Sequence, residues 1–312
     1  MKRAWNLIWK IALALAVPGI VLGLIGWSLG GPRPVEWRNG FHVATAQSIH
    51  IDQPNLDAFT SIDTNVATLD VQVVTGDHYG LKVDCDNTYR DITWSNENGV
   101  LALNQVEPPM IGIFWNLDHG QAVITVPADV KLDAIGVQSQ TGNLVIGVPA
   151  DQINGQSATG DVTLNAAAAQ ADLNSSTGHI QANNPDIHEL KIWTTTGNVD
   201  VSNSGKIVQV QTTTGNVTIS GYGCPEASAL EPCSITVTTT TGSASVKRGV
   251  DWLDTDYTLN STTGSINTSG VGAPSTSTTF NSSLNGSAVT MVLLLNVTTS
   301  TGNISVTLTS AD

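Results

Sequence analysis

Apolar and polar side chains alternate along most of the chain, in short runs that are separated by turn residues. The runs VDV at 199–201 and VTI at 217–219 each place an apolar residue at the first and third positions. Residues two apart in a strand share one face, so each run can bury a row of apolar side chains. Valine and threonine are also branched at Cβ, which favours strands over helices. The pattern predicts an all-β chain.

A short motif recurs through the second half of the chain: Thr-Gly, a polar residue, and then apolar residues at alternate positions. The first five glycines of the series are separated by 18, 18, 19 and 18 residues. Each copy follows a second alternating segment, such as VQVQT at 208–212, so one unit comprises strand, turn, strand and loop. The turn glycines are Gly142, Gly160, Gly178, Gly197, Gly215, Gly242, Gly264 and Gly302, and a degenerate copy has Gly286.

One such unit cannot bury its apolar row alone, whereas stacked copies can. The repeat predicts a single-stack β-solenoid with coils of about 18 residues, in which successive coils pair about 4.8 Å apart and Thr and Asn form ladders. Gly197 and Gly215 are each expected to have positive φ, and the Asn, Asp or Ser after a turn glycine to hydrogen-bond the local backbone. The solenoid is predicted to span 43–312, in a looser form over 43–140 and as regular repeats over 141–312.

The N-terminal segment has a different character. Residues 11–29 carry no charge, and at about 1.5 Å per helical residue they reach close to the roughly 30 Å of a bilayer core. We expect a transmembrane anchor at 11–29, a short cytoplasmic end at 1–10 and a linker at 30–42. Two other interpretations stay open: a cleaved signal peptide, with small residues at Ala44 and Ala46, and a buried helix of the core.

Basic residues flank the apolar segment on its N-terminal side, at Lys2, Arg3 and Lys10. The positive-inside rule then places the N-terminus on the inner side of the cell membrane and the body outside the cytoplasm. The bias is modest, because Arg33 and Arg38 lie on the other side of the segment.

Beyond residue 40 the chain is strongly acidic, with seven basic and 25 acidic side chains. Such a body repels phosphate and has no basic patch, which argues against nucleic acid as a partner. The histidines do not cluster in the sequence, and we expect no metal, no cofactor and no catalytic residue. Asp161 and Asp200 come from neighbouring positions of different coils, so a carboxylate pair of the kind that glycosidases use stays open.

Two cysteines, Cys224 and Cys233, lie within the long spacing of 27 residues between Gly215 and Gly242, in an insertion that contains two prolines. In an exported protein this arrangement favours a disulfide that closes a small loop. Two free thiols or a metal site are the alternatives, although the sequence offers few further metal ligands nearby. Cys85 continues an apolar alternation, which indicates a buried thiol.

A second atypical segment, residues 107–120, concentrates apolar side chains after two prolines. One interpretation is a long loop that folds back onto the coils. The other is an exposed apolar patch that recognises a ligand. The residues concerned are Met110, Ile113, Phe114 and Trp115.

The segment VITVPADVKLDAIGVQSQTGNLVI at 123–146 contains a strand that ends in Val-Pro, a second strand, and the first Thr-Gly turn. Together with the coils that follow, this arrangement resembles the bacterial putative-adhesin family, also called the toast-rack β-solenoid, over about residues 43–312. The resemblance implies a cell-envelope protein that is not an enzyme and has no catalytic residue to transfer. Family members often have unknown ligands, and some are tied to envelope-stress signalling.

We therefore expect a membrane-anchored, extracytoplasmic, adhesin-like protein that binds or scaffolds at the bacterial cell envelope and catalyses no reaction. An envelope-stress sensor is the first alternative; with about ten cytoplasmic residues, it would have to signal through a membrane partner. A polysaccharide-active β-helix enzyme is the second. The residues name neither a ligand nor a protein partner, and self-association into a homo-oligomer stays open.

Overall fold

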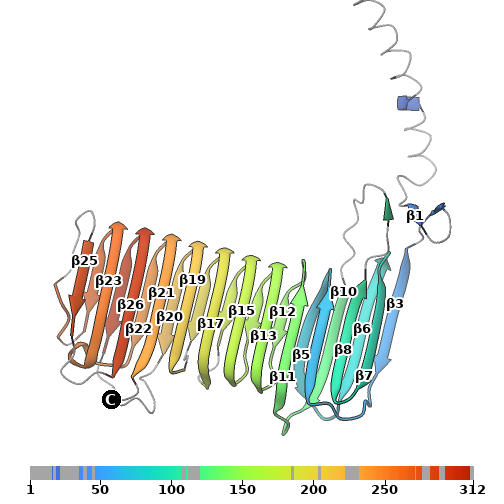
Figure 1. Ribbon diagram of the computed structural model, residues 1–312, viewed down its shortest axis with the longest axis horizontal. Helices are drawn as coiled ribbons and strands as arrows, with labels where there is room; N and C mark the ends of the chain where they lie inside the picture. The colour runs from blue at the N-terminus through green and yellow to red at the C-terminus, as the bar shows by residue number, and fades with distance from the viewer. Residues whose placement is uncertain are drawn as a thin grey trace, which may run out of the picture.

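Two long β-sheets face each other along an elongated stack of coils, which Figure 1 shows from the side. The computed structural model describes residues 16, 19–21, 35–37, 41–43, 46–106, 110–111, 120–183, 186–202, 205–221, 232–270, 272–275, 282–287 and 292–309. Over these residues the predicted all-β solenoid is confirmed.

The first sheet, called sheet I, has 12 strands. In spatial order they are β24 (Ile266–Ser269), β27 (Ile304–Leu308), β22 (Ala244–Arg248), β20 (Val217–Gly221), β18 (Val199–Ser202), β16 (Ile180–Ala182), β14 (Val162–Leu164), β12 (Leu144–Ile146), β5 (Leu69–Gly76), β10 (Gly120–Pro127), β6 (Gly80–Thr88) and β3 (Gln47–Gln53).

The second sheet, called sheet II, also has 12 strands. In spatial order they are β25 (Ser282–Gly286), β23 (Thr255–Thr263), β26 (Leu293–Thr301), β21 (Cys233–Thr241), β19 (Ile207–Thr214), β17 (Ile187–Thr196), β15 (Ala168–Thr177), β13 (Ala150–Thr159), β11 (Leu132–Ser139), β4 (Ser61–Val66), β8 (Val100–Val106) and β7 (Asp91–Glu97). A small third sheet has the order β2 (Phe41–Val43), β1 (Val35–Trp37) and β9 (Met110–Ile111), and one 3-10 turn, η1, covers Trp252–Asp254.

Each regular coil contributes a long strand to sheet II and, after the Thr-Gly turn, a short strand to sheet I. Strand β13 pairs in parallel with β15, so that Ala150 lies opposite Ala168, 18 residues later. In sheet I, Val162 of β14 lies opposite Ile180 of β16 with the same offset. The repeat length sets this register, because a slip of one residue would turn every apolar row to solvent.

The core lies between the two sheets and runs the length of the stack. Leu173 of β15 and Val162 of β14 are fully buried, and along each strand buried residues alternate with more exposed ones. Burial of one such side chain contributes about 1.5–3 kcal/mol. A single coil would leave both sides of its apolar row open to water. Neighbouring coils cover those sides, so the row is buried only in the stack.

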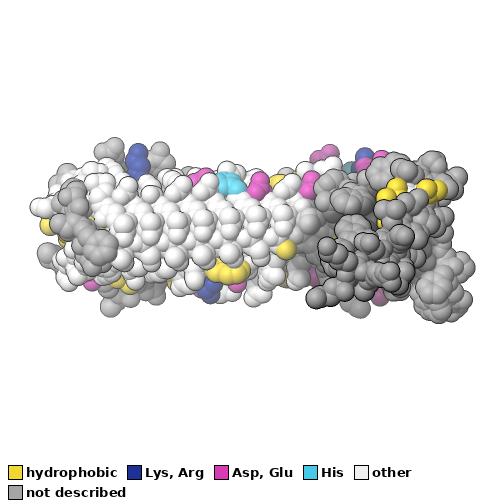
Figure 2. Space-filling model, turned by 90° about the horizontal axis from the view of Figure 1, so that it is seen from above, with side chains coloured by type: hydrophobic (Ala, Val, Ile, Leu, Met, Phe, Trp, Pro, Cys, Tyr) yellow, Lys and Arg dark blue, Asp and Glu magenta, His cyan; other side chains and the backbone are white. Residues whose placement is uncertain are grey.

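The Thr-Gly turns form a column of threonines along one edge of the stack. Thr159, Thr177, Thr196 and Thr214 lie opposite one another in successive strands of sheet II, which confirms the predicted threonine ladder. Seen from above in Figure 2, this edge is a nearly uncharged, regularly repeating ridge, and the coloured charged side chains lie along its flanks.

The residue that follows each turn glycine bonds to the neighbouring coil rather than to its own turn. Oδ1 of Asn198 accepts the backbone N–H of Asn216, and Oδ1 of Asn216 accepts that of Ser243, both at 2.9 Å. Oδ1 of Asp161 accepts the N–H of His179 at 2.7 Å. The expected asparagine ladder is therefore present, but it ties coils together where a local turn bond was expected.

A second column lies just inside the turns. The buried Ser157 donates its hydroxyl to the carbonyl of Gly142 at 3.0 Å, and Thr299 donates to that of Gly242 at 3.0 Å. These bonds satisfy hydroxyl groups that would otherwise be costly to bury.

The coils are not stacked in the order of the sequence. Strand β26 pairs in parallel with both β21 and β23, so the coil at 293–308 lies between those at 233–248 and 255–269; Figure 1 shows the same order. At the other end, β4 pairs with β8 and β11, and β5 pairs with β10 and β12. The expectation that each coil pairs with the next in sequence is wrong at both ends.

Antiparallel strands complete both ends of the stack. Strands β3, β6 and β7 pair antiparallel at the first end, within the region predicted to be looser. At the other end β25 pairs antiparallel with β23. Gly286 is the last residue of β25 and not the turn of a degenerate coil, so that prediction is wrong; its motif lacks the preceding threonine.

Most of the predicted anchor at 11–29 falls outside the described residues; only residues 16 and 19–21 are described, as helix. Among the residues described, no helix is long and apolar enough to cross a bilayer. The anchor, the cytoplasmic end and the linker stay predictions.

Candidate functional site

The outer face of sheet II carries rows of polar side chains across four neighbouring strands, β11, β13, β15 and β17. Gly136, Asn154, Asp172 and Lys191 lie opposite one another in register. Alternate residues of a strand point to the same side, so a second outward row lies two positions further on. That row is Gln138, Gln156, Asn174 and Trp193. We call these two rows the amide face.

Two shallow hollows lie side by side on the amide face. One, of about 290 Å³, covers the first row and is also lined by Gln152 and Gln170. The other, of about 480 Å³, covers the second row and is also lined by Ala158. Small residues such as Gly136 and Ala158 leave this space, and Trp193 stands at one margin.

Hydrogen bonds run between neighbouring side chains of the amide face. Nε2 of Gln156 donates to Oδ1 of Asn154 at 2.9 Å, and Nδ2 of Asn174 donates to Oδ1 of Asp172 at 3.4 Å. An amide group has two N–H donors and an oxygen with two lone pairs, so each of these bonds leaves part of the hydrogen-bonding capacity of the amides unused. The arrangement can bind a ligand that offers both kinds of partner.

The charged side chains at the edge of the amide face are paired with each other. Lys191 Nζ lies 2.7 Å from Oε1 of Glu189, whose Oε2 accepts a hydrogen bond from Gln170 at 3.2 Å. The bond from Lys191 is the main reason that the pKa of Glu189 is lowered, and Glu189 in turn raises the pKa of Lys191. Near neutral pH both groups are charged and their charges offset one another.

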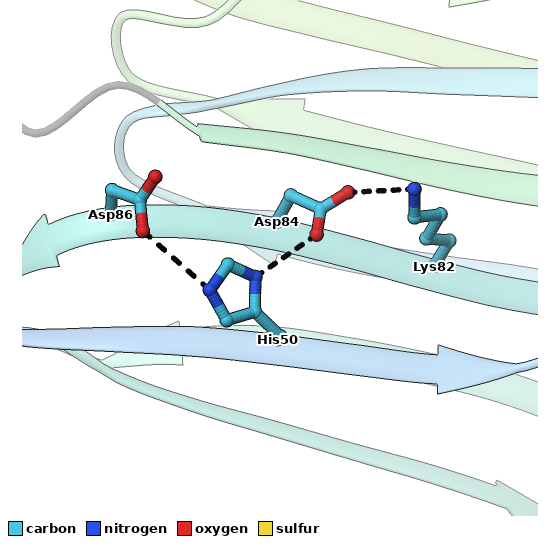
Figure 3. A network of polar contacts seen from close by, with 4 residues as sticks. All are labelled: His50, Lys82, Asp84 and Asp86. Carbon is cyan, nitrogen blue, oxygen red and sulfur yellow. Dashed lines mark hydrogen bonds and ion pairs between the residues drawn. The ribbon is translucent and has the colours of Figure 1, made fainter.

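A second polar cluster lies on sheet I near the first end of the stack (Figure 3). His50 of β3 points between two carboxylates of β6, with Nδ1 3.1 Å from Asp84 Oδ1 and Nε2 3.6 Å from Asp86 Oδ1. Lys82 Nζ lies 3.1 Å from the other oxygen of Asp84. The hydrogen bond with His50 is the largest cause that lowers the pKa of Asp84, followed by that with Lys82.

The cluster around His50 is a solvated group of ion pairs. The side chains of His50, Lys82 and Asp84 are 60%, 59% and 49% exposed, and ion pairs at such exposure contribute little to stability. Over the part of the chain that the structure describes, no three His, Cys, Asp or Glu side chains are placed to hold a metal ion.

Asp161 and Asp200, the two carboxylates considered for catalysis, meet the same histidine. Asp161 accepts the backbone N–H of His179, and Asp200 Oδ2 lies 3.2 Å from His179 Nε2. Asp161 thus has the role of a turn residue that joins two coils. The two carboxylates lie on the turn side of the stack, away from the hollows of the amide face.

The other predicted site residues are placed as follows. The turn glycines line the turn edge, each against the glycine of a neighbouring coil or, for Gly142, against Leu69. Cys233 is buried at the start of β21, while Cys224 lies outside the described residues. Met110 belongs to β9. The remaining residues of the proposed recognition loop, Ile113, Phe114 and Trp115, lie outside the described residues.

The amide face was missed in the sequence, although a signal for it exists. Aligning the coils by their glycines places Gln156 beside Asn174 and Asn154 beside Asp172, since each pair is 18 residues apart. Polar residues at outward positions are common on any strand exposed to solvent. The residues of the amide face differ from other outward polar residues only in lying side by side across coils and beneath the two hollows.

Comparison with known proteins agrees with this architecture. The model of the Toastrack DUF4097 family matches residues 59–307. Among curated proteins, none has a sequence that matches the chain.

Three solved structures of low sequence identity are similar to the chain. A putative adhesin from Parabacteroides distasonis ATCC 8503 is 14% identical, with 84% of this chain and 98% of that one covered and a TM-score of 0.49. A putative lipid binding protein from the same strain is 16% identical, with coverage of 83% and 96% and a TM-score of 0.43. A putative adhesin from Bacteroides fragilis NCTC 9343 is 14% identical, with coverage of 85% and 98% and a TM-score of 0.38.

The assignment rests on the family match and not on these three likenesses. That match extends over most of the chain, from the residues before β4 into β27. The chain therefore belongs to the Toastrack DUF4097 family.

Proposed function

We propose that the chain is a membrane-anchored, adhesin-like protein of the bacterial cell envelope, which holds a rigid binding surface outside the cytoplasm. The observation that carries the proposal is the amide face. It presents amide groups with unused hydrogen-bonding capacity and two hollows, on four coils that are held in register. A preformed surface of this kind loses little conformational freedom when a ligand binds.

The solenoid provides the rigidity that such a surface needs. Each coil is tied to its neighbours by backbone ladders in both sheets and by the asparagine bonds at the turns, as between Asn198 and Asn216. The basic, apolar N-terminus supports the anchor and the orientation. An anchored rod would carry the amide face away from the bilayer surface.

Binding can be tested with two arginine substitutions at outward positions. Gln156→Arg fills the hollow of the amide face, whereas Thr218→Arg adds the same side chain to the outer face of sheet I. Full-length protein, solubilised in detergent, is incubated with envelope extract, and the components that co-purify are identified. We expect at least one envelope component to co-purify with the wild type and with Thr218→Arg but not with Gln156→Arg. Equal co-purification with all three proteins would contradict the proposal.

Topology requires a separate measurement. Protease added to spheroplasts should digest the body while a tag on residues 1–10 stays protected. A tag that is cleaved or labelled from outside would refute the proposed orientation.

A further inference from the structure

We propose that the amide face binds a neutral polysaccharide, with a sugar ring stacked on Trp193 and further sugar units along the hollows across β15, β13 and β11. The inference rests on the proposed function, since it names the ligand class of the same surface. Its three supports are the chemistry of the lining, the exposed indole and the distribution of charge.

The lining matches the chemistry of sugar hydroxyl groups. A hydroxyl both donates and accepts hydrogen bonds, and so does a Gln or Asn amide. Gln138, Gln156 and Asn174 repeat this chemistry once per coil, in register. Neighbouring coils are about 4.8 Å apart, which is close to the length by which one hexose extends a polysaccharide chain. Successive sugars can therefore meet equivalent amides.

Trp193 provides an apolar platform at one end of the array. Trp193 is 44% exposed, and no other aromatic residue whose burial the structure describes is as exposed. Asn174 and Gln211 flank it in register on the two neighbouring strands. An exposed indole combines a large flat apolar face with a polar N–H group. The face of a sugar ring that carries only C–H groups fits such a surface, while its hydroxyls reach the flanking amides.

The charge of the surface favours a neutral ligand over an anionic one. Asp172 lies in the first row of the amide face, and the only cation lining its hollow, Lys191, is paired with Glu189 at 2.7 Å. The chain as a whole carries a net charge of −14. A polymer of uronic acids or phosphates would meet repulsion without an available counter-charge.

The test uses full-length protein in detergent and calorimetric titration with soluble probes. Hexasaccharides of neutral hexose and of N-acetylhexosamine are compared with an oligogalacturonate of equal length. We expect at least one neutral probe to bind and the anionic probe to bind at least about tenfold more weakly. Trp193→Ala and Gln156→Ala should each weaken the neutral probe at least about tenfold, and Trp193→Phe should retain most of the affinity.

Leu294→Ala is the matched control, because Leu294 is also 44% exposed on an outward position of sheet II but lies on β26, away from the hollows. It should leave binding unchanged, and all variants should keep the wild-type melting temperature. The inference is overturned if no neutral probe binds, if the anionic probe binds as well, or if Trp193→Ala has no more effect than Leu294→Ala. Should Gln156→Arg still release an envelope component in that case, the ligand class is wrong and the proposed binding function stands.

Discussion

A β-carbon added to Gly215 would lie 1.9 Å from the carbonyl oxygen of Gly197 in the preceding coil. The same relationship holds along the whole turn edge, where each glycine faces backbone of its neighbour at 1.8–2.3 Å from the position of a β-carbon. The φ angles of Gly197 and Gly215 are 159° and 152°, which confirms the predicted positive φ and lies in a range that residues with a β-carbon rarely adopt. Glycine is needed here for two reasons: the coils approach one another closely, and the positive φ disfavours any residue with a β-carbon.

Gly215→Ala should therefore destabilise the protein, although alanine is the smallest possible addition. The clash is with backbone and cannot be relieved by rotating a side chain, so we expect a loss of about 1–3 kcal/mol in the free energy of unfolding. Gly136→Ala is the control, since its β-carbon would meet no atom closer than 3.6 Å. Denaturant unfolding measures both; a neutral Gly215→Ala would contradict the close stacking of the turns.

The turns of adjacent coils should also be energetically coupled. Gly197 and Gly215 are in contact, and substitutions at contacting sites do not add. The double variant Gly197→Val with Gly215→Val should differ from the sum of the single variants by at least about 0.5 kcal/mol. Strict additivity would mean that the turns act as independent units.

The asparagine ladder predicts a graded series at Asn216. Asn216→Ala removes the acceptor of the Ser243 N–H and should cost about 0.5–1.5 kcal/mol. Asn216→Asp puts a carboxylate oxygen where the amide oxygen was, so it keeps an acceptor and should lower the free energy of unfolding by less. Ser should also be tolerated better than Ala, because Ser243 Oγ accepts the N–H of Asn303 at 3.2 Å in the equivalent position. Equal losses for all three would show that the inter-coil bond is not what the residue contributes.

The pKa of Asp84 should lie below that of an ordinary aspartate and should rise when His50 is replaced by alanine. A carboxyl whose pKa is lowered on folding stabilises the folded state above its unfolded pKa, and this contribution disappears as the pH falls through the folded pKa. Lys82→Ala should raise the pKa of Asp84 as well, because Lys82 also lowers it through a hydrogen bond and its charge. Carboxyl carbon NMR titration gives the midpoints directly, and an unchanged midpoint in His50→Ala would contradict the pairing in Figure 3.

The disulfide between Cys224 and Cys233 stays a prediction. If it forms, the exported protein, denatured without reductant, should react with a thiol probe only at Cys85. After reduction, all three cysteines of the chain should react. Breaking a disulfide that closes so short a loop should lower the free energy of unfolding by at most about 3 kcal/mol. Labelling of Cys233 without reductant would exclude the bond.

Removing residues 292–312 should make backbone amides outside the deleted segment exchange faster with solvent. Strand β23 pairs with β26 on one side and with the short antiparallel β25 on the other, so deletion leaves the coil at 255–269 without its parallel partner. Hydrogen exchange should then show fast amides throughout β23 and β24, while β17 and β19 stay protected. Slow exchange in β23 would mean that this coil re-pairs directly with β21.

The sequence predicted the coils but not their order, for a physical reason. The register of Ala150 with Ala168 follows from the repeat length, because only that offset keeps apolar rows inside. The coils that contain Gly264 and Gly302 have the same motif, so either could lie beside the coil of Gly242. Nothing in the alternation of their residues distinguishes the two arrangements.

The candidate site could be predicted even less well. Gln156 and Asn174 are ordinary surface residues when read along the chain, and their meaning arises from contacts between coils. Likewise the asparagines after the turns resemble local turn residues, because the donors that they satisfy lie 18 or more residues away.

The position of the last coil has a consequence for biosynthesis. During synthesis, the coil at 255–269 emerges before the coil at 293–308, which in the folded protein lies between it and the coil at 233–248. This end of the stack can therefore close only after residues 293–308 have been synthesised. New copies of the repeat could be added by gene duplication in the middle of the stack, where order in space follows order in sequence, whereas a new copy beside β26 would have to separate strands that are already paired on both sides.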